Sequence, residues 1–189
     1  YQWSILPGQR QSLDATLAAA LHDHAIGDAL DEALDQGPFA GSRIVGVMGG
    51  HAAQRGSREF ADAARLGSLL AQAGFAVATG GGPGAMEAAN MGAYFSGRPD
   101  AELQAALAAL ADVPGFRPSV TAWARQAAAV VEHYPQGTPT LGIPTWFYGH
   151  EPPNVFAEGI AKYFSNAVRE DGLLARSNAG VIVMPGAAG

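Results

Sequence analysis

The sequence predicts an α/β fold: a Rossmann-like, doubly wound parallel sheet with an N-terminal helical extension. Short apolar runs alternate along the chain with longer segments of helical spacing, which is the pattern of a sheet covered by helices on both faces. The runs are continuously apolar, as is typical of strands buried on both sides. Glycine or proline follows each run, and sheets of this kind bind ligands at the carboxyl ends of their strands.

Four apolar runs are the expected strands, at residues 43–48, 75–79, 140–143 and 180–184. If these strands are parallel, the turns that follow them meet at one edge of the sheet. The turns contain Gly49 and Gly50, the glycines after Thr79, Pro144, and Pro185 with Gly186. We therefore expect the binding site at this edge.

We expect helices in six segments, in which apolar residues recur with helical spacing: residues 11–34, 57–73, 85–94, 101–111, 120–134 and 155–175. Gly27 and Gly172 are candidate break points in the first and last segments, and Asp100 is the expected N-cap of the fourth. We divide the chain into a helical extension, residues 1–42, and a Rossmann-like nucleotide-binding domain, residues 43–189. Because the sequence stops in a glycine-rich turn, we expect this domain to be incomplete at its C-terminus.

Composition narrows the class of protein. The 189 residues are 48% hydrophobic and 15% charged, which is enough apolar material for a packed core. The net charge of −6 and a single lysine argue against a nucleic-acid partner. No apolar run reaches the length of about 18 residues that a membrane helix needs, so we expect no membrane partner. The absence of cysteine fits a cytoplasmic protein, which is the location that we expect.

Metal binding is not expected. The chain has no cysteine, which excludes disulfides and thiolate ligands. His22 and His24 resemble a metal pair, but residues i and i+2 of a helix do not share a face. We therefore expect residues 22–24 to belong to a solvated, acidic helix face.

The glycine-dense segment after Thr79 carries the clearest functional signal. An apolar strand, three consecutive glycines, Gly84 and an alanine-rich helix follow one another here. Such a turn brings backbone N–H groups and the positive end of a helix dipole to a phosphate. No lysine completes a Walker A motif, and no dinucleotide fingerprint follows the first strand. The alternative is a tight strand-to-helix connection without a ligand.

The residues of this segment, Gly80-Gly81-Gly82-Pro83-Gly84-Ala85-Met86-Glu87-Ala88-Ala89-Asn90, resemble the LOG family when taken with the later run from Pro185 to Gly189. LOG proteins are Rossmann-like nucleotide 5′-monophosphate phosphoribohydrolases. The Met-Glu-Ala-Ala-Asn continuation and the run from Glu151 to Asn154 are similar to the bacterial purine/pyrimidine nucleotide nucleosidase branch. The resemblance covers about residues 43–189 and leaves residues 1–42 without a counterpart.

The resemblance implies hydrolysis of a nucleoside 5′-monophosphate to a free base and ribose 5-phosphate, with no cofactor, by a homodimer or larger homo-oligomer. The first family signature, Gly-Gly-Gly-x-x-Gly-x-Met, is complete here. The second, Pro-Gly-Gly-x-Gly-Thr-x-x-Glu, is matched at Pro185, Gly186 and Gly189, whereas Ala187 replaces a glycine. The Thr and the catalytic Glu would follow Gly189.

The implied site has one catalytic residue, Arg169, which lies one residue from the family spacing; Arg176 is the second choice. The implied nucleotide- and phosphate-binding residues are Gly49, Gly50, Thr79, Gly80, Gly81, Gly82, Gly84, Met86, Glu87, Asn90, Pro185, Gly186 and Gly189.

Each assignment has a plainer alternative. Arg169 could be a solvated helix arginine paired with Glu170 or Asp171. Glu87 could serve only the helix dipole, and Asn90 could be a polar surface residue. The aromatic residues 146–148 could stack on a base or form a packed surface. For the whole protein, the rival is a non-catalytic nucleotide- or cofactor-binding carrier of the same fold.

Overall fold

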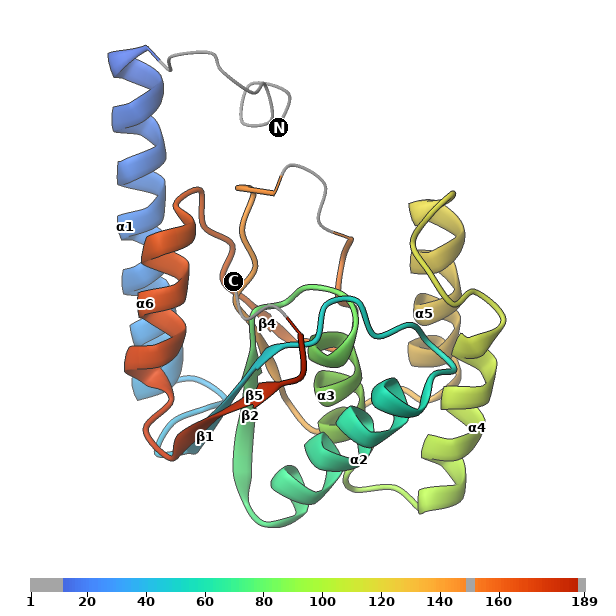
Figure 1. The fold of residues 1–189 in the computed structure, drawn as a ribbon. Helices are drawn as coiled ribbons and strands as arrows, with labels where there is room; N and C mark the ends of the chain where they lie inside the picture. The colour runs from blue at the N-terminus through green and yellow to red at the C-terminus, as the bar shows by residue number, and fades with distance from the viewer. Residues whose placement is uncertain (1–11, 149–151, 187–189) are drawn as a thin grey trace.

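The computed structural model describes residues 12–148 and 152–186, and Figure 1 shows their arrangement. The helices and strands within these residues are α1 (Leu13–Asp35), β1 (Arg43–Gly49), α2 (Arg58–Gln72), β2 (Phe75–Thr79), α3 (Ala85–Tyr94), α4 (Asp100–Ala111), α5 (Val120–His133), β3 (Leu141–Gly142), β4 (Gly159–Ile160), α6 (Asn166–Arg176) and β5 (Gly180–Met184).

The strands form one sheet in the order β4-β3-β2-β1-β5, and every pairing is parallel. β1 lies inside the sheet and pairs over five residue positions with β2 on one side and with β5 on the other. The predicted α/β fold with a Rossmann-like parallel sheet is confirmed. The chain moves from β1 through β4 in one direction and then returns past β1 to β5, so the direction of winding reverses between β1 and β5.

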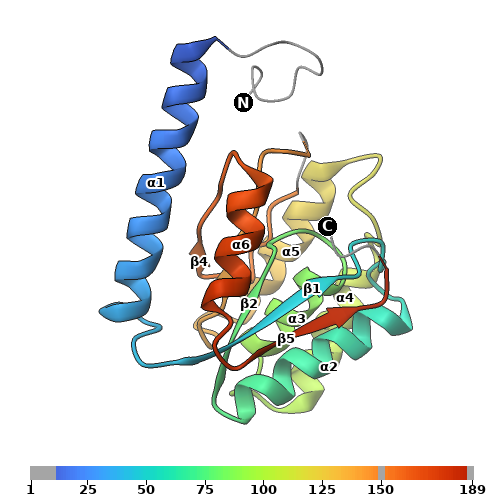
Figure 2. The same cartoon turned by 60° about the vertical axis from the view of Figure 1, so that its left-hand side comes forward.

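The side chains of β1 alternate between two helical layers. Ile44 and Met48 pack with residues of α1 and α6, in a cluster that includes Leu30 and Leu173. Val47 points to the opposite face and packs with Ala89 and Ala93 of α3. The views in Figures 1 and 2 show the same layering, with α1 and α6 on one side of the sheet and α2 and α3 on the other.

Serine hydroxyls determine where four of these helices begin. Ser12, Ser57, Ser119 and Ser165 each accept a hydrogen bond from a backbone N–H in the first turn of α1, α2, α5 and α6. The capping oxygen satisfies an amide that the helix itself leaves unpaired. Asp100 does not have the predicted capping role: Pro99 is the N-cap of α4, and Asp100 lies inside its first turn.

The largest error of the sequence prediction concerns residues 155–165, which were expected to be helical. They form a turn at residues 155–156, then β4 and irregular segments, and the helix begins only at Asn166. The reason is that these residues bond to the strand beside them: Gly159 N–H donates to Thr140 O, and Tyr163 N–H donates to Pro144 O. Three other expectations also differ. α1 continues without a break through Gly27, α6 continues without a break through Gly172, and β3 is two residues long.

The description of residues 22–24 as a solvated face is wrong for Asp23, which is buried. His24 does lie in solvent, where it pairs with Asp28 on α1. Within residues 12–148 and 152–186, no group of three or more His, Cys, Asp or Glu residues could hold a metal ion. In the same part of the chain, no helix is long and apolar enough to cross a membrane.

Two glycines let α2 and α3 approach each other closely. A Cβ atom on Gly92 of α3 would overlap the backbone carbonyl of Ala64, and one on Gly67 of α2 would overlap the carbonyl of Ala89. The two backbones are therefore in direct contact at both positions. This contact fixes α3, and with it the glycine loop that precedes α3, against the rest of the layer.

Gly92→Ala is expected to lower the free energy of unfolding by about 3 kcal/mol, because the added methyl group must push the two helices apart. Chemical denaturation measures this change. Gly97→Ala is the control, since Gly97 is exposed and its added Cβ would meet nothing closer than Thr138 Oγ1 at 4.0 Å. Equal stability of the two variants would contradict the close packing of α2 and α3.

Candidate functional site

The turns after β1 and β5 meet where the winding of the sheet reverses. Gly50 has a φ of +66°, and a Cβ atom there would lie 2.6 Å from Ala85 Cβ and 3.1 Å from Met184 Cβ. A hollow of about 360 Å³ opens beside this contact, and Pro185 and Gly186 also line it. Ligands of doubly wound sheets bind in crevices at such reversal points.

The glycine loop joins the same edge from β2. Gly81 has a φ of +70° and packs against Pro144, whose Cδ would be 2.8 Å from an added Cβ. Gly84 has a φ of +76° and precedes α3, whose first N–H group, that of Ala85, donates to Gly50 O at 2.9 Å. Only glycine adopts these backbone angles without strain. The loop therefore presents backbone, rather than side chains, at the N-terminus of α3.

Arg169 of α6 reaches this loop from the other side of the sheet. Only 6% of the residue is exposed, so it is not the solvated arginine of the plainer alternative. A Cβ atom on Gly80 would lie 3.1 Å from Arg169 Nη1 and 2.9 Å from Met86 Sδ. The structure thus brings together three of the predicted site residues: Gly80, Met86 and Arg169.

The guanidinium group of Arg169 is held on one side and unpaired on another. Its Nη2 donates to Asn166 Oδ1 at 2.6 Å and lies 3.6 Å from Glu170 Oε1. Its Nε is buried and has no hydrogen-bond partner. An unpaired buried N–H of a cation is unfavourable, so this group has capacity for an acceptor.

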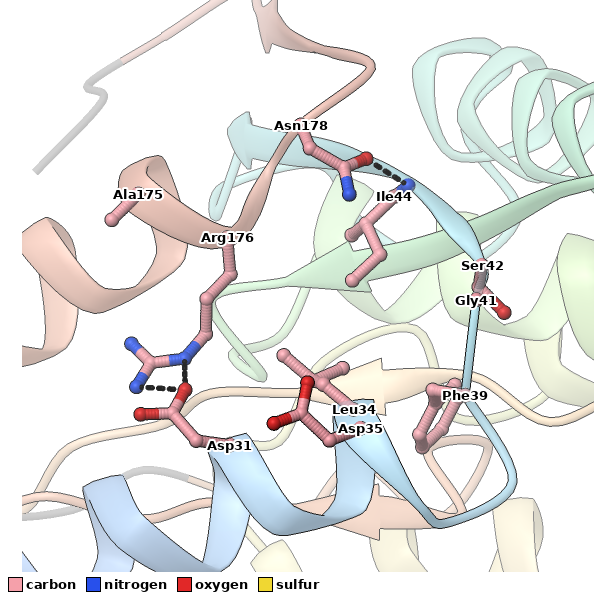
Figure 3. Close-up of a pocket in the computed structure, with 10 residues that line it drawn as sticks. All are labelled: Asp31, Leu34, Asp35, Phe39, Gly41, Ser42, Ile44, Ala175, Arg176 and Asn178. Carbon is pink, nitrogen blue, oxygen red and sulfur yellow. Dashed lines mark hydrogen bonds and ion pairs between the residues drawn. The ribbon is translucent and has the colours of Figure 1, made fainter.

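Arg176, the second choice, lies elsewhere. Figure 3 shows it at the C-terminal end of α6, pointing to Asp31 of α1, with Nη2 2.7 Å from Asp31 Oδ1. The hollow beside it, about 370 Å³, is lined by residues before and at the start of β1, among them Ser42 and Ile44. This is the amino end of β1, opposite the glycine turns, so Arg169 lies beside the glycine loop and Arg176 does not.

Glu87 forms a buried ion pair that the sequence did not indicate. Arg55 Nε donates to Glu87 Oε2 at 3.1 Å, and Arg55 Nη2 donates to Glu87 Oε1. The guanidinium also donates to Trp123 O and lies over the ring of Trp123, 3.8 Å from its centroid. Both side chains are 1% exposed. Glu87 is therefore engaged with Arg55 rather than directed to the helix dipole alone.

A hollow of about 310 Å³ borders this pair and is also lined by Pro83 and Gly84 of the glycine loop. Burial raises the pKa of Glu87 from 4.5 to about 7, although the hydrogen bond and the charge of Arg55 act in the opposite direction. The carboxyl group consequently changes its charge near neutral pH, at the first turn of the helix that follows the glycine loop.

Asn90 and Thr79 form a buried network beneath the glycine loop. Thr79 Oγ1 donates to Asn90 Oδ1 at 2.6 Å and accepts from Gly81 N–H at 3.0 Å. Asn90 Nδ2 donates to Thr140 Oγ1, and Asn154 Nδ2 donates to Asn90 Oδ1, each at 2.9 Å. The surface-polar alternative for Asn90 is wrong, since Asn90 is fully buried. These residues support the loop from within the protein.

The remaining predicted residues differ in where they lie and in how far they are exposed. Gly49 ends β1 with a φ of +78°, and Gly82 is buried in the loop. Trp146 stacks on Phe164 with centroids 4.5 Å apart, whereas Phe147 and Tyr148 are largely exposed. Gly189 lies outside the described residues.

The fold and the site define a class: a parallel Rossmann-like sheet with a glycine loop, a helix N-terminus and a buried arginine at the carboxyl ends of its strands. Residues 42–98 match the model of the SLOG cluster4 family. This stretch contains β1, α2, β2, the glycine loop and α3.

The SLOG superfamily includes LOG-like Rossmann proteins, so the match confirms the resemblance seen in the sequence. It points to a nucleotide-related Rossmann-like protein. No curated protein matches the chain.

The raised pKa of Glu87 makes stability depend on pH. The carboxyl group of Glu87 has a higher pKa in the folded protein, about 7, than in the unfolded chain, 4.5. Its protonation therefore stabilises the folded protein. This stabilisation is complete below pH 4.5 and declines as the pH rises to about 7. The unfolding free energy of the wild type, taken relative to Glu87→Gln, is expected to fall by about 3 kcal/mol across this range. Denaturation of both proteins from pH 4 to 8 measures the difference, and a constant difference would contradict the assignment.

Proposed function

We propose that this protein binds the phosphate of a nucleoside 5′-monophosphate against the glycine loop, with Arg169 as the cation that receives it. The observation that carries the proposal is the position of the Arg169 guanidinium, buried beside Gly80 with an unpaired Nε. A guanidinium pairs with phosphate through charge-assisted hydrogen bonds, and loop amides at a helix N-terminus add further donors.

We further propose that the bound nucleotide is hydrolysed to a free base and ribose 5-phosphate. Cleavage of an N-glycosidic bond places positive charge on the sugar, and a carboxylate can stabilise that charge or activate the attacking water. Glu170, held by a hydrogen bond from Asn166 Nδ2 at 2.9 Å, is a carboxylate beside Arg169.

Nucleotide binding without hydrolysis is the second candidate function. Two observations favour it. The carboxylate nearest the glycine loop in sequence, Glu87, is occupied by Arg55. Ala187 also stands where the second LOG signature has a glycine. A carrier or sensor would use the same phosphate contacts but would release no base.

Arg169→Ala is expected to weaken binding of AMP by roughly tenfold to a hundredfold, because it removes a charge-assisted contact to phosphate. Isothermal titration measures the binding. A panel of nucleoside 5′-monophosphates, assayed for free base and ribose 5-phosphate, tests the reaction.

Arg58→Ala is the matched control, since the Arg58 side chain is 90% exposed on α2. Tight AMP binding without base release from any nucleotide would overturn hydrolysis and leave the carrier. If the wild type binds no nucleotide, the proposal itself is wrong.

Gly80→Ala tests the close approach of the loop to Arg169 without changing a charge. The new methyl group would crowd Met86 Sδ and Arg169 Nη1, and the φ of Gly80 lies outside the region that only glycine favours. We expect a loss of AMP affinity of about tenfold, with the unfolding free energy changed by about 1 kcal/mol or less. Unchanged affinity would show that phosphate binding does not depend on the packing of Arg169 against Gly80.

A further inference from the structure

We propose that Asp23 of α1 is a positioning residue for Arg169: it fixes the N-terminal end of α6 and thereby holds the guanidinium against the glycine loop. The inference rests on the proposed function, because it assigns a role in binding to the helix that precedes the Rossmann-like sheet. Asp23 lies outside residues 42–98, the part that matches the family model.

The contact of Asp23 with the chain before α6 is bidentate. Asp23 Oδ1 accepts the N–H of Phe164 at 2.7 Å, and Oδ2 accepts the N–H of Ser165 at 2.8 Å. Asp23 is 6% exposed, whereas the side chain of the next residue, His24, is 75% exposed. Hydrogen bonds from backbone amides to a buried carboxylate are short and strong, so they fix the position of this segment.

The segment that Asp23 holds leads directly to Arg169. Ser165 is the N-cap of α6, and its hydroxyl accepts the N–H of Val168. Asn166, the next residue, accepts the hydrogen bond from Arg169 Nη2 at 2.6 Å and donates to Glu170. A displacement of Phe164 and Ser165 therefore moves the cap, then Asn166, and then the guanidinium group.

α1 is joined to α6 at a second point, away from the site. Asp31 of α1 pairs with Arg176 in the last turn of α6. The two helices lie side by side in Figures 1 and 2, so Asp23 and Asp31 brace opposite ends of α6. Breaking the Asp31 pair loosens the helix packing but leaves the Asn166–Arg169 end in place. Substitution of Asp31 is therefore a matched control for substitution of Asp23.

The first test needs no ligand. NMR follows the exchange of the amide protons of Phe164 and Ser165 and of the Nε proton of Arg169, in the wild type, Asp23→Ala, Asp23→Asn and Asp31→Asn. We expect Asp23→Ala to accelerate the exchange of all three protons, and Asp23→Asn, which keeps one acceptor, to do so less. Asp31→Asn is expected to leave the Arg169 proton protected. Protection of that proton in Asp23→Ala would overturn the inference.

The second test is AMP binding in a double-mutant cycle. We expect Asp23→Ala to weaken binding about tenfold in the wild type and to have no effect when Arg169 is already alanine, because the two residues act through one group. Asp31→Asn should bind AMP as the wild type does. Additive losses in the cycle would mean that Asp23 affects AMP binding independently of Arg169 and would overturn the positioning role.

The two tests separate the two proposals. If the wild type binds no AMP while the exchange pattern is as expected, the proposed function fails and the positioning of Arg169 stands. If AMP binds but Asp23→Ala behaves as Asp31→Asn in both tests, the function stands and the positioning role fails.

Discussion

The buried amide of Asn90 is the interaction on which the architecture of the site depends. It joins α3 to Thr79 at the end of β2, to Thr140 before β3, and to Asn154 in the segment that leads to β4. Buried polar groups are nearly always paired, so a network in which each amide group of Asn90 has its partner strongly favours one arrangement of its parts. The conformation of the glycine loop follows, because Thr79 Oγ1 also accepts the N–H of Gly81.

Charge is distributed unevenly over the molecule. The chain as a whole carries −6, yet the buried groups around the glycine loop include two arginines, Arg55 and Arg169. Arg55 is balanced by Glu87 within the interior. The charge of Arg169 is balanced less closely, because its Nη2 lies 3.6 Å from Glu170 Oε1. A protein that is acidic overall therefore keeps a local cationic site, which suits an anionic ligand better than composition alone indicates.

The sequence predicts the frame of this molecule well and its polar interior poorly. The apolar runs that became β1, β2 and β5 are long enough to be read without a partner, and the glycine signature identifies the loop. β4 is two residues long and acquires its structure from hydrogen bonds to its neighbours, so its own residues carry no strand signal. The ion pair of Arg55 and Glu87 spans 32 positions, and the contact of Asp23 with Ser165 spans 142. No local sequence pattern encodes contacts between residues so far apart in the chain. The burial of Arg169 could not be predicted either, because it results from the packing of α6 beside the glycine loop.

The backbone contact between α2 and α3 has a consequence for recognition. Helices in backbone contact at two glycine positions cannot slide past one another without first separating. The packing of this layer therefore holds the N-terminus of α3, and the glycine loop before it, in one orientation. For the proposed phosphate ligand, such a preorganised loop would lose little conformational entropy on association, and the affinity would depend on the contacts that the ligand makes.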